Sequence, residues 1–279
     1  MKLNVENLKQ KYKIFFKNEI LDELISEVVF GFSEIEEYIK NGETKSILEV
    51  GSGPGILLTE LKKIYPNIKM TGLEPLSSGY DRYQNINENI KKSNNNIQDF
   101  NILNKKIEEF NTNEKFDLIF SVNVLDHVPG DWKEHIKSIS KLLKPNGTYI
   151  SLSPNYDFPY ESHYIIPIII NKKITKFLFK KIIQKHDDRN NLSTNHWENI
   201  SFISKRKIKK YLNEKNYNFY FDEKIKNRLL KRLSTDKELR KKQGLVANFA
   251  IISKNLFLDN LFFDILKIPF PYMKLVIKN

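Results

Sequence analysis

The sequence predicts an α/β protein in which helices cover both faces of a mostly parallel, doubly wound sheet. Two observations predict this fold class. Apolar runs typical of buried strands alternate with helical patterns between residues 46 and 153, and a glycine-rich turn joins the first run to a helix. The 279 residues, 40% of them hydrophobic, are enough for a sizeable core. We therefore expect a single domain over 1–279, with leading helices in 1–45 and a ligand-binding core in 46–153.

The composition excludes several classes of site. The chain has no cysteine, so disulfides, thiolate metal sites and a cysteine nucleophile are excluded. No apolar run approaches the length of a membrane span, and the first residues lack the pattern of a secretory signal, so we expect a cytoplasmic protein. A net charge of +12 favours anionic partners. No recognised motif with interleaved aromatic residues supports nucleic-acid binding, so nucleic acid is not the expected partner.

The first predicted strand, 46–50, leads into a turn and then a helix over 56–64. The turn contains Gly51, Ser52, Gly53 and Gly55. Backbone N–H groups in such a turn face a ligand at close approach. A dinucleotide turn has a different glycine spacing, and the Glu49 carboxylate would repel a pyrophosphate. The turn therefore predicts a ligand with a cationic end.

The stretch E-V-G-S-G-P-G, from Glu49 to Gly55, resembles the first motif of class I S-adenosylmethionine-dependent methyltransferases. The stretch S-V-N-V-L-D-H-V at 121–128 is similar to the S-x-N-V-L-E-H-V of the same family. The resemblance implies a methyltransferase with a Rossmann-like, seven-stranded sheet and S-adenosyl-L-methionine as its cofactor. It also implies that Glu49 and the glycine turn hold the methionine end, whose ammonium and sulfonium are cationic.

Helical patterns precede the first strand, within residues 8–40. In the resembled family such leading helices close over the cofactor, which would place Tyr12 or Phe16 in its pocket. Simple packing of these two side chains against the sheet is the alternative.

The second predicted strand, 68–73, ends at Glu74 and Pro75. Glu74 follows the glycine turn by about twenty residues, where α/β nucleotide sites place the carboxylate that accepts hydrogen bonds from ribose hydroxyls. We expect Glu74 and Pro75 to contact the cofactor.

A helix around 80–92 and a third strand over 100–103 are predicted next. The resemblance places the adenine near Ile107. Lys106 replaces the acidic side chain expected there, so we expect the backbone around Ile107 to make the contact.

The fourth predicted strand is 116–121, followed by a helix over 132–143 and a fifth strand over 148–152. The resemblance implies that Ser121 touches the methionine portion and that His127 lies near the cofactor on the helix after the strand. A packed histidine that only shapes the wall is the alternative for His127.

Residues 154–200 are predicted to form the acceptor side, because they start at a strand end beside the crevice. Their P-N-Y-x-F-P-Y-E-x-H-Y-x-I-P run resembles bacterial methyltransferases that act on surface polysaccharides or other small acceptors. A hydroxyl acceptor loses a proton as it attacks, so we expect His163 as the base, with Glu161 or Asp157 orienting or replacing it. A histidine that only orders the loop is the alternative.

Residues 171–185 are predicted to form a helix that caps the site, with a membrane-surface helix as the alternative. We interpret four further polar residues as solvated and expect no metal, because methyl transfer does not need one. They are His186, Asp187, Asp188 and His196.

Residues 201–279 are predicted to contain a sixth strand at 217–222, a helical insertion at 224–267 and a last strand at 274–277. The resemblance places the last strand antiparallel between strands five and six. The apolar side chains of the insertion indicate burial, a homodimer contact or a peripheral membrane contact.

The predicted function is methyl transfer from S-adenosylmethionine to a hydroxyl of a small polar or anionic acceptor, such as a nucleotide-linked or phosphorylated sugar used for a surface glycan. Two alternatives stay open. One is an RNA methyltransferase or another N-methyltransferase, against which the lack of an N-P-P-Y motif counts. The other is a non-catalytic regulatory protein that binds the cofactor.

Overall fold

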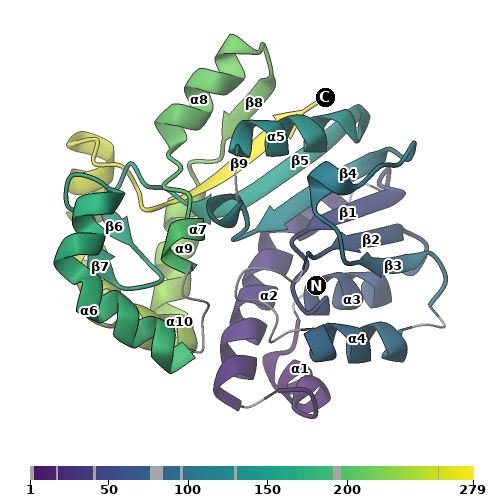
Figure 1. Cartoon of the computed structure of the whole chain (residues 1–279), viewed down its shortest axis with the longest axis horizontal. Coiled ribbons are helices and arrows are strands. Elements are labelled where there is room, and N and C mark those ends of the chain that lie inside the picture. Colours follow the sequence, from purple (N-terminus) through teal and green to yellow (C-terminus); the bar gives the residue numbers. More distant parts are fainter. Residues whose placement is uncertain are drawn as a thin grey trace.

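A seven-stranded sheet with helices on both faces forms the centre of the molecule (Figure 1). The computed structural model describes residues 3–16, 18–39, 42–75, 84–94, 97–128, 131–190, 196–256 and 258–279. The strand order is β3-β2-β1-β4-β5-β9-β8. The strands are β1 (Ser46–Val50), β2 (Lys69–Leu73), β3 (Phe100–Leu103), β4 (Phe116–Val122), β5 (Leu143–Pro154), β8 (Asn218–Phe221) and β9 (Tyr272–Lys278).

The pairing of the strands confirms the predicted doubly wound sheet. β1 pairs in parallel with β2 on one side and β4 on the other, and the chain order reverses there. All five residues of β1 are buried, including the polar Ser46 and Glu49, as expected for a central parallel strand. β9 runs antiparallel to both β5 and β8, at the predicted place. A sheet of this topology binds ligands beyond the carboxyl ends of its strands, at the point of reversal.

Two groups of helices cover the sheet. They are α1 (Val5–Tyr12), α2 (Asn18–Ile39) and α3 (Ile56–Ile64), which pack on one face, and α5 (Trp132–Lys141) and α8 (Lys205–Glu214), which pack on the other. α4 (Gln84–Ser93) adjoins α3, and residues 80–83 of the predicted helix lie outside the described part of the chain. Side chains of Asp131 and Ser204 accept hydrogen bonds from the first turns of α5 and α8, which fixes where these helices begin.

The structure differs from the prediction in the fifth strand. β5 already begins at Leu143, which pairs with Phe116, whereas this strand was predicted over 148–152; a register shift between Phe116 and Leu118 marks a bulge. The helix after β4 that carries His127 is the short 3₁₀ helix η3 (Leu125–His127).

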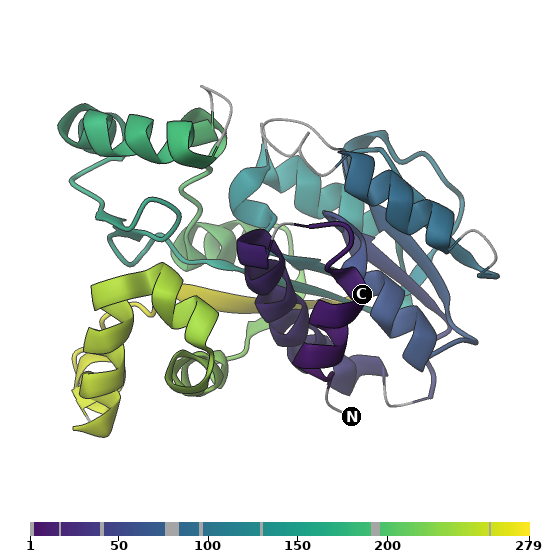
Figure 2. The ribbon, with the colours of Figure 1, turned by 90° about the horizontal axis from the view of Figure 1, so that it is seen from below.

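A lobe beside the sheet is formed by residues 155–190 and 196–200 together with the helices of the insertion (Figure 2). Its elements are β6 (Tyr160–Glu161), β7 (Ile166–Pro167), α6 (Lys172–Asn190), α7 (His196–Asn199), α9 (Ile225–Thr235), α10 (Lys237–Asn255) and the π-helix η4 (Asn260–Ile265). The expected helices over 171–185 and 224–267 are present, whereas the β6–β7 hairpin was not predicted. Among the described residues, no helix combines the length and the apolar character that crossing a membrane requires.

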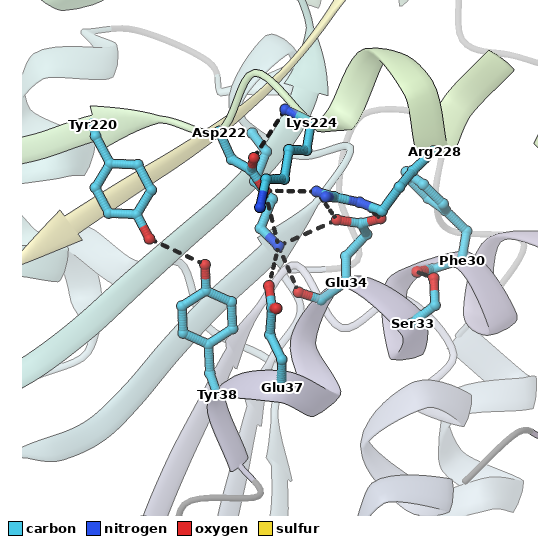
Figure 3. Close-up of polar contacts among 10 residues, drawn as sticks. Phe30, Ser33, Glu34, Glu37, Tyr38, Tyr220, Asp222, Lys224 and Arg228 are labelled. Atoms are coloured by element: carbon cyan, nitrogen blue, oxygen red, sulfur yellow. Dashed lines mark hydrogen bonds and ion pairs between the residues drawn. The ribbon is translucent and has the colours of Figure 1, made fainter. Parts of the chain in front are cut away.

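A buried ion cluster fastens this lobe to the leading helix α2 (Figure 3). The Lys274 side chain is fully buried, and its Nζ donates to the Glu34 carbonyl oxygen at 2.8 Å and lies 3.1 Å from the Glu34 carboxylate and 3.0 Å from that of Glu37. Arg228 on α9 donates two hydrogen bonds to Glu34, at 2.6 and 2.7 Å, and one to Asp222. These contacts join α2, β9 and α9 across long sequence separations.

Replacing Glu34 is expected to destabilise the fold strongly, because it removes the buried carboxylate that contacts both the Lys274 ammonium and the Arg228 guanidinium. We expect Glu34→Ala to lower the free energy of unfolding by about 3–5 kcal/mol in urea denaturation. Glu37→Ala is the matched control: its carboxylate contacts the same ammonium, but its side chain is 63% exposed, so we expect a loss below about 1 kcal/mol. Equal losses for the two variants would contradict this account of the cluster.

Candidate functional site

One cavity of about 1110 Å³ lies beyond the carboxyl ends of β1, β2 and β4. Its walls include the glycine turn on one side and residues of the 154–200 segment, α9, α10 and η4 on the other. This is the place that the reversal of strand order predicts for a ligand.

The glycine turn is shaped by close packing beneath it. Gly51 has φ of +71°, and a Cβ there would lie 2.3 Å from Cγ2 of Val124. Gly55 has φ of +85° and precedes α3, and a Cβ there would lie 2.3 Å from Cδ1 of Ile102. Both the left-handed backbone and the lack of space require glycine at these two positions. Gly53 has φ of +52° but open space around its missing side chain.

Two buried polar atoms in and beside this turn form no hydrogen bond within the described part of the chain. The carboxylate oxygen Oε2 of Glu49 and the hydroxyl of Ser52 are buried, and neither has a hydrogen-bond partner among the described residues. Glu74 accepts a hydrogen bond from the Gly53 N–H at 2.8 Å, so it braces the turn from the end of β2. Burial, together with the negative charge of Glu74, raises the pKa of Glu49 well above its usual value. A cationic ligand group would relieve both effects.

The other predicted cofactor residues divide into two groups. Pro75 and Ile107 line the cavity, and Ile107 is buried at the start of the 3₁₀ helix η2 (Ile107–Glu109). Ser121 does not line it: its hydroxyl lies 2.9 Å from the Tyr149 hydroxyl, between β4 and β5. Gly55 also lies behind the wall, where it starts α3.

Tyr12 and Phe16 pack in the core under α2, and the Tyr12 hydroxyl donates to Glu60 at 2.6 Å. Neither side chain lines the cavity. The packing alternative is therefore correct for both residues, and the expectation of a cofactor contact is wrong.

The two predicted catalytic residues meet His127 at the cavity wall. Nδ1 of His163 lies 2.6 Å from Oε1 of Glu161, and Nε2 of His163 lies 3.0 Å from Nε2 of His127. Glu161 is fully buried and also accepts hydrogen bonds from the Tyr164 N–H at 2.7 Å and the Tyr156 hydroxyl at 3.1 Å. Two segments far apart in the sequence, η3 and β6, thus bring these groups together.

The charges of this cluster follow from its contacts. Burial on its own would raise the pKa of Glu161. The charge and hydrogen bond of His163, together with two backbone hydrogen bonds, outweigh this effect and hold the pKa at about 2. Burial likewise lowers the pKa of His163, yet Glu161 and Asp126 raise it overall. For His127, burial dominates and lowers the pKa. Glu161 is therefore an anion that holds the Nδ1–H of His163.

Three residues of this site were not predicted from the sequence. Asp126 is completely buried beside the two imidazoles, and His196 packs on His127 with ring centroids 5.7 Å apart. Burial and the neighbouring histidines lower the pKa of His196 to about 3. Asp187 is buried and accepts a hydrogen bond from the Tyr164 hydroxyl at 2.7 Å.

The interpretation of His196 and Asp187 as solvated is therefore wrong, because α6 and α7 fold over the histidine pair, whereas Asp188 is exposed as expected. A signal existed for Asp126, since the resembled family also has an acidic residue before the histidine. A signal for His196 was its neighbour Trp197, which is buried.

Comparisons with known sequences point to one family. A family model described as a methyltransferase domain matches residues 21–221 of this chain. Two curated sequences from strains of Mycobacterium tuberculosis, each named an uncharacterized protein, are 28% identical to it over 208 residues, which is 72% of this chain and 68% of theirs.

Two solved structures, with TM-scores of 0.52 and 0.50, share the fold. The cyclopropane synthase MmaA2 of Mycobacterium tuberculosis aligns with a TM-score of 0.52 at 14% identity, over 89% of this chain and 84% of its own. An O-methyltransferase from a Brevibacillus brevis multienzyme, in complex with S-adenosyl-L-homocysteine, aligns with a TM-score of 0.50 at 13% identity, over 92% and 74%. A methyltransferase from Clostridium acetobutylicum is 25% identical with a TM-score of 0.36, and this chain spans about half of it, 48%.

The buried Glu49 carboxyl is expected to cost stability and to serve binding. The pKa of Glu49 is raised in the folded chain, so above pH 4.5 the folded state keeps a proton on this carboxyl that the unfolded state loses. The free energy of unfolding therefore falls as the pH rises from about 4.5 through the raised pKa. We expect ligand-free Glu49→Gln to unfold at an equal or higher temperature than the parent chain at pH 7, with the difference vanishing below about pH 4.5.

The same variant is expected to bind S-adenosylmethionine at least about tenfold more weakly, since its amide carries no charge to face the cationic methionine end. Thermal unfolding across pH and calorimetric titration provide the two measurements. A variant that unfolds at a lower temperature at neutral pH yet binds the cofactor normally would contradict the role assigned to Glu49.

Proposed function

We propose that this chain, which belongs to the family of class I S-adenosylmethionine-dependent methyltransferases, transfers the cofactor's methyl group to a hydroxyl of a small polar acceptor. The observation that carries the proposal is the shared cavity: the glycine turn with Glu49 and the pair His127–His163 line the same space. A cofactor site and a proton-accepting site therefore face each other.

The residues at the strand ends fit the cofactor. Glu49 and the glycine turn would hold its cationic methionine end, Glu74 and Pro75 the ribose, and the backbone around Ile107 the adenine. The unpartnered buried oxygens of Glu49 and Ser52 support this assignment. When bound, S-adenosylmethionine supplies an electrophilic methyl group on a sulfonium.

The residues on the opposite wall fit a hydroxyl acceptor with a negative group. In the proposed reaction the acceptor oxygen takes the methyl group from sulfur, and the hydroxyl proton leaves to the His127–His163 pair, which Glu161 orients. Arg189, Lys241 and Lys242 line the cavity and supply positive charge for a phosphate. A phosphorylated or nucleotide-linked sugar has both features, which supports a role in making a surface glycan precursor.

An apolar part of the wall favours a second candidate acceptor. The side chains concerned come from α9, α10, η4 and the segment before β9: Leu229, Leu233, Val246, Phe262, Phe263, Ile268 and Phe270. An acceptor in which a phosphorylated sugar is attached to a lipid chain would use both the cationic and the apolar parts. Exposed apolar side chains among the lysines of α6, such as Phe177 and Leu178, would then meet the surface of an anionic membrane.

The function is tested by cofactor binding and by turnover. We expect the purified chain to bind S-adenosylmethionine in calorimetric titration and to methylate a sugar nucleotide, a sugar phosphate or a lipid-linked sugar phosphate. We expect His163→Ala to lower turnover by about 10²–10⁴-fold with little change in cofactor affinity. Asp188→Asn, an exposed change on α6, is the control and should leave both unchanged.

Two outcomes would contradict the proposal in different ways. If the intact chain does not bind S-adenosylmethionine, the proposed methyltransferase activity is excluded. Normal cofactor binding with turnover only on RNA, in a salt-sensitive manner, would replace the acceptor class by nucleic acid.

A further inference from the structure

We propose that Asp126, His127 and His163 form a binding site for one divalent transition-metal cation. The site itself follows from the positions of these three side chains, whereas its part in catalysis rests on the methyl transfer proposed above.

The three side chains direct one atom each toward a common point. Nε2 of His127 and Nε2 of His163 are 3.0 Å apart, and Oδ2 of Asp126 lies 3.4 Å from the first and 3.7 Å from the second. The point in their plane that is equidistant from the three atoms lies about 2.0 Å from each, so an ion slightly out of this plane would lie at the length of zinc–nitrogen and zinc–carboxylate bonds. The triangle therefore has the size of one face of a tetrahedral metal site.

The Asp126 carboxylate supplies an independent reason for a cation. The residue has no exposed surface, and neither side-chain oxygen accepts a hydrogen bond from any residue that the structure describes. A buried carboxylate without hydrogen bonds is costly, and such groups in proteins pair with a cation or coordinate a metal. The two imidazole nitrogens are its nearest charge partners, and neither forms a hydrogen bond with it.

Glu161 has the position of an outer partner of a metal ligand. Its carboxylate binds Nδ1 of His163 at 2.6 Å and is itself fixed by Tyr164 and Tyr156. With the proton of the neutral imidazole held at Nδ1, the lone pair of His163 lies at Nε2 and points toward Asp126 and His127. Carboxylate–histidine pairs of this kind orient ligands and raise their basicity at many metal sites.

The ligand set selects a class of metal. Two imidazoles and one carboxylate suit borderline divalent ions such as Zn²⁺, Fe²⁺, Co²⁺ and Ni²⁺, whereas Mg²⁺ and Ca²⁺ prefer oxygen ligands alone. Three protein ligands leave a fourth position open, as in catalytic metal sites. Both histidines line the cavity that contains the glycine turn, so the open position faces the acceptor space.

A cation here changes how the acceptor hydroxyl loses its proton. An oxygen bound at the open position becomes more acidic, because the cation stabilises its anion. Nε2 of His163 then serves as a ligand and not as the base, since its single lone pair cannot do both. The proton would then leave to solvent.

The inference is tested by metal binding to the full chain after treatment with a chelator. We expect one equivalent of Zn²⁺ to bind in calorimetric titration, Co²⁺ to give the visible absorption of a four-coordinate site, and Mg²⁺ not to bind. Asp126→Asn and His127→Gln should each lower zinc affinity by more than about 100-fold, and Glu161→Gln by about 10–100-fold. His186→Gln is the matched control and should bind zinc like the parent chain.

Thermal unfolding shows whether a variant has lost the site or the fold. Zinc should raise the unfolding temperature of the parent chain but not of Asp126→Asn. The metal-free variant should unfold at no lower temperature than the metal-free parent, because it lacks the buried carboxylate that accepts no hydrogen bond from the described residues. Absence of stoichiometric zinc binding, or zinc binding unaffected by Asp126→Asn, would overturn the inference. S-adenosylmethionine binding by the metal-free chain is measured separately, so a failure of the metal site is distinguishable from a failure of the proposed function.

Discussion

The contact of the glycine turn with the side chains beneath it is the constraint on which the site depends. Gly51 lies against Val124 and Gly55 against Ile102, with no space for a Cβ at either position. This packing fixes the end of β1, the start of α3 and the loop after β4 in one arrangement. Glu49 and the segment from Val124 to His127 therefore hold constant positions relative to each other, as precise alignment of two reacting groups requires.

The histidine cluster needs residues from outside the parallel sheet. His127 follows β4, whereas His163 and Glu161 come from a hairpin in the lobe. The site is thus assembled across the junction between core and lobe. The Glu34–Lys274–Arg228 cluster strengthens the same junction from the side of α2, because it joins that helix to β9 and α9.

Much of the fold was predictable because its signals are local. The buried run at 46–50, the glycine spacing and the Pro and Gly residues each report on their own segment. The pairing of Glu161 with His163 was also predictable, since the two residues are close in sequence. The burial of Asp126, His196 and Lys274 was not predictable, because segments distant along the chain cover each of them. The lobe covers Asp126 in η3, and α2 covers Lys274 in β9. From the sequence alone, a charged residue is expected to be exposed, because the distant residues that pair with it are not known.

The position of β9 has a consequence for how the chain folds. β9 pairs with β5 along seven residues, although the stretch from 155 to 271 separates them, and β8 in that stretch pairs only with β9. Closing so long a loop is slow, so the parallel strands can assemble well before the sheet is complete. In the interval β5 is an open edge, able to accept a strand from another molecule. Until β9 pairs with it, this edge exposes the partly folded chain to aggregation.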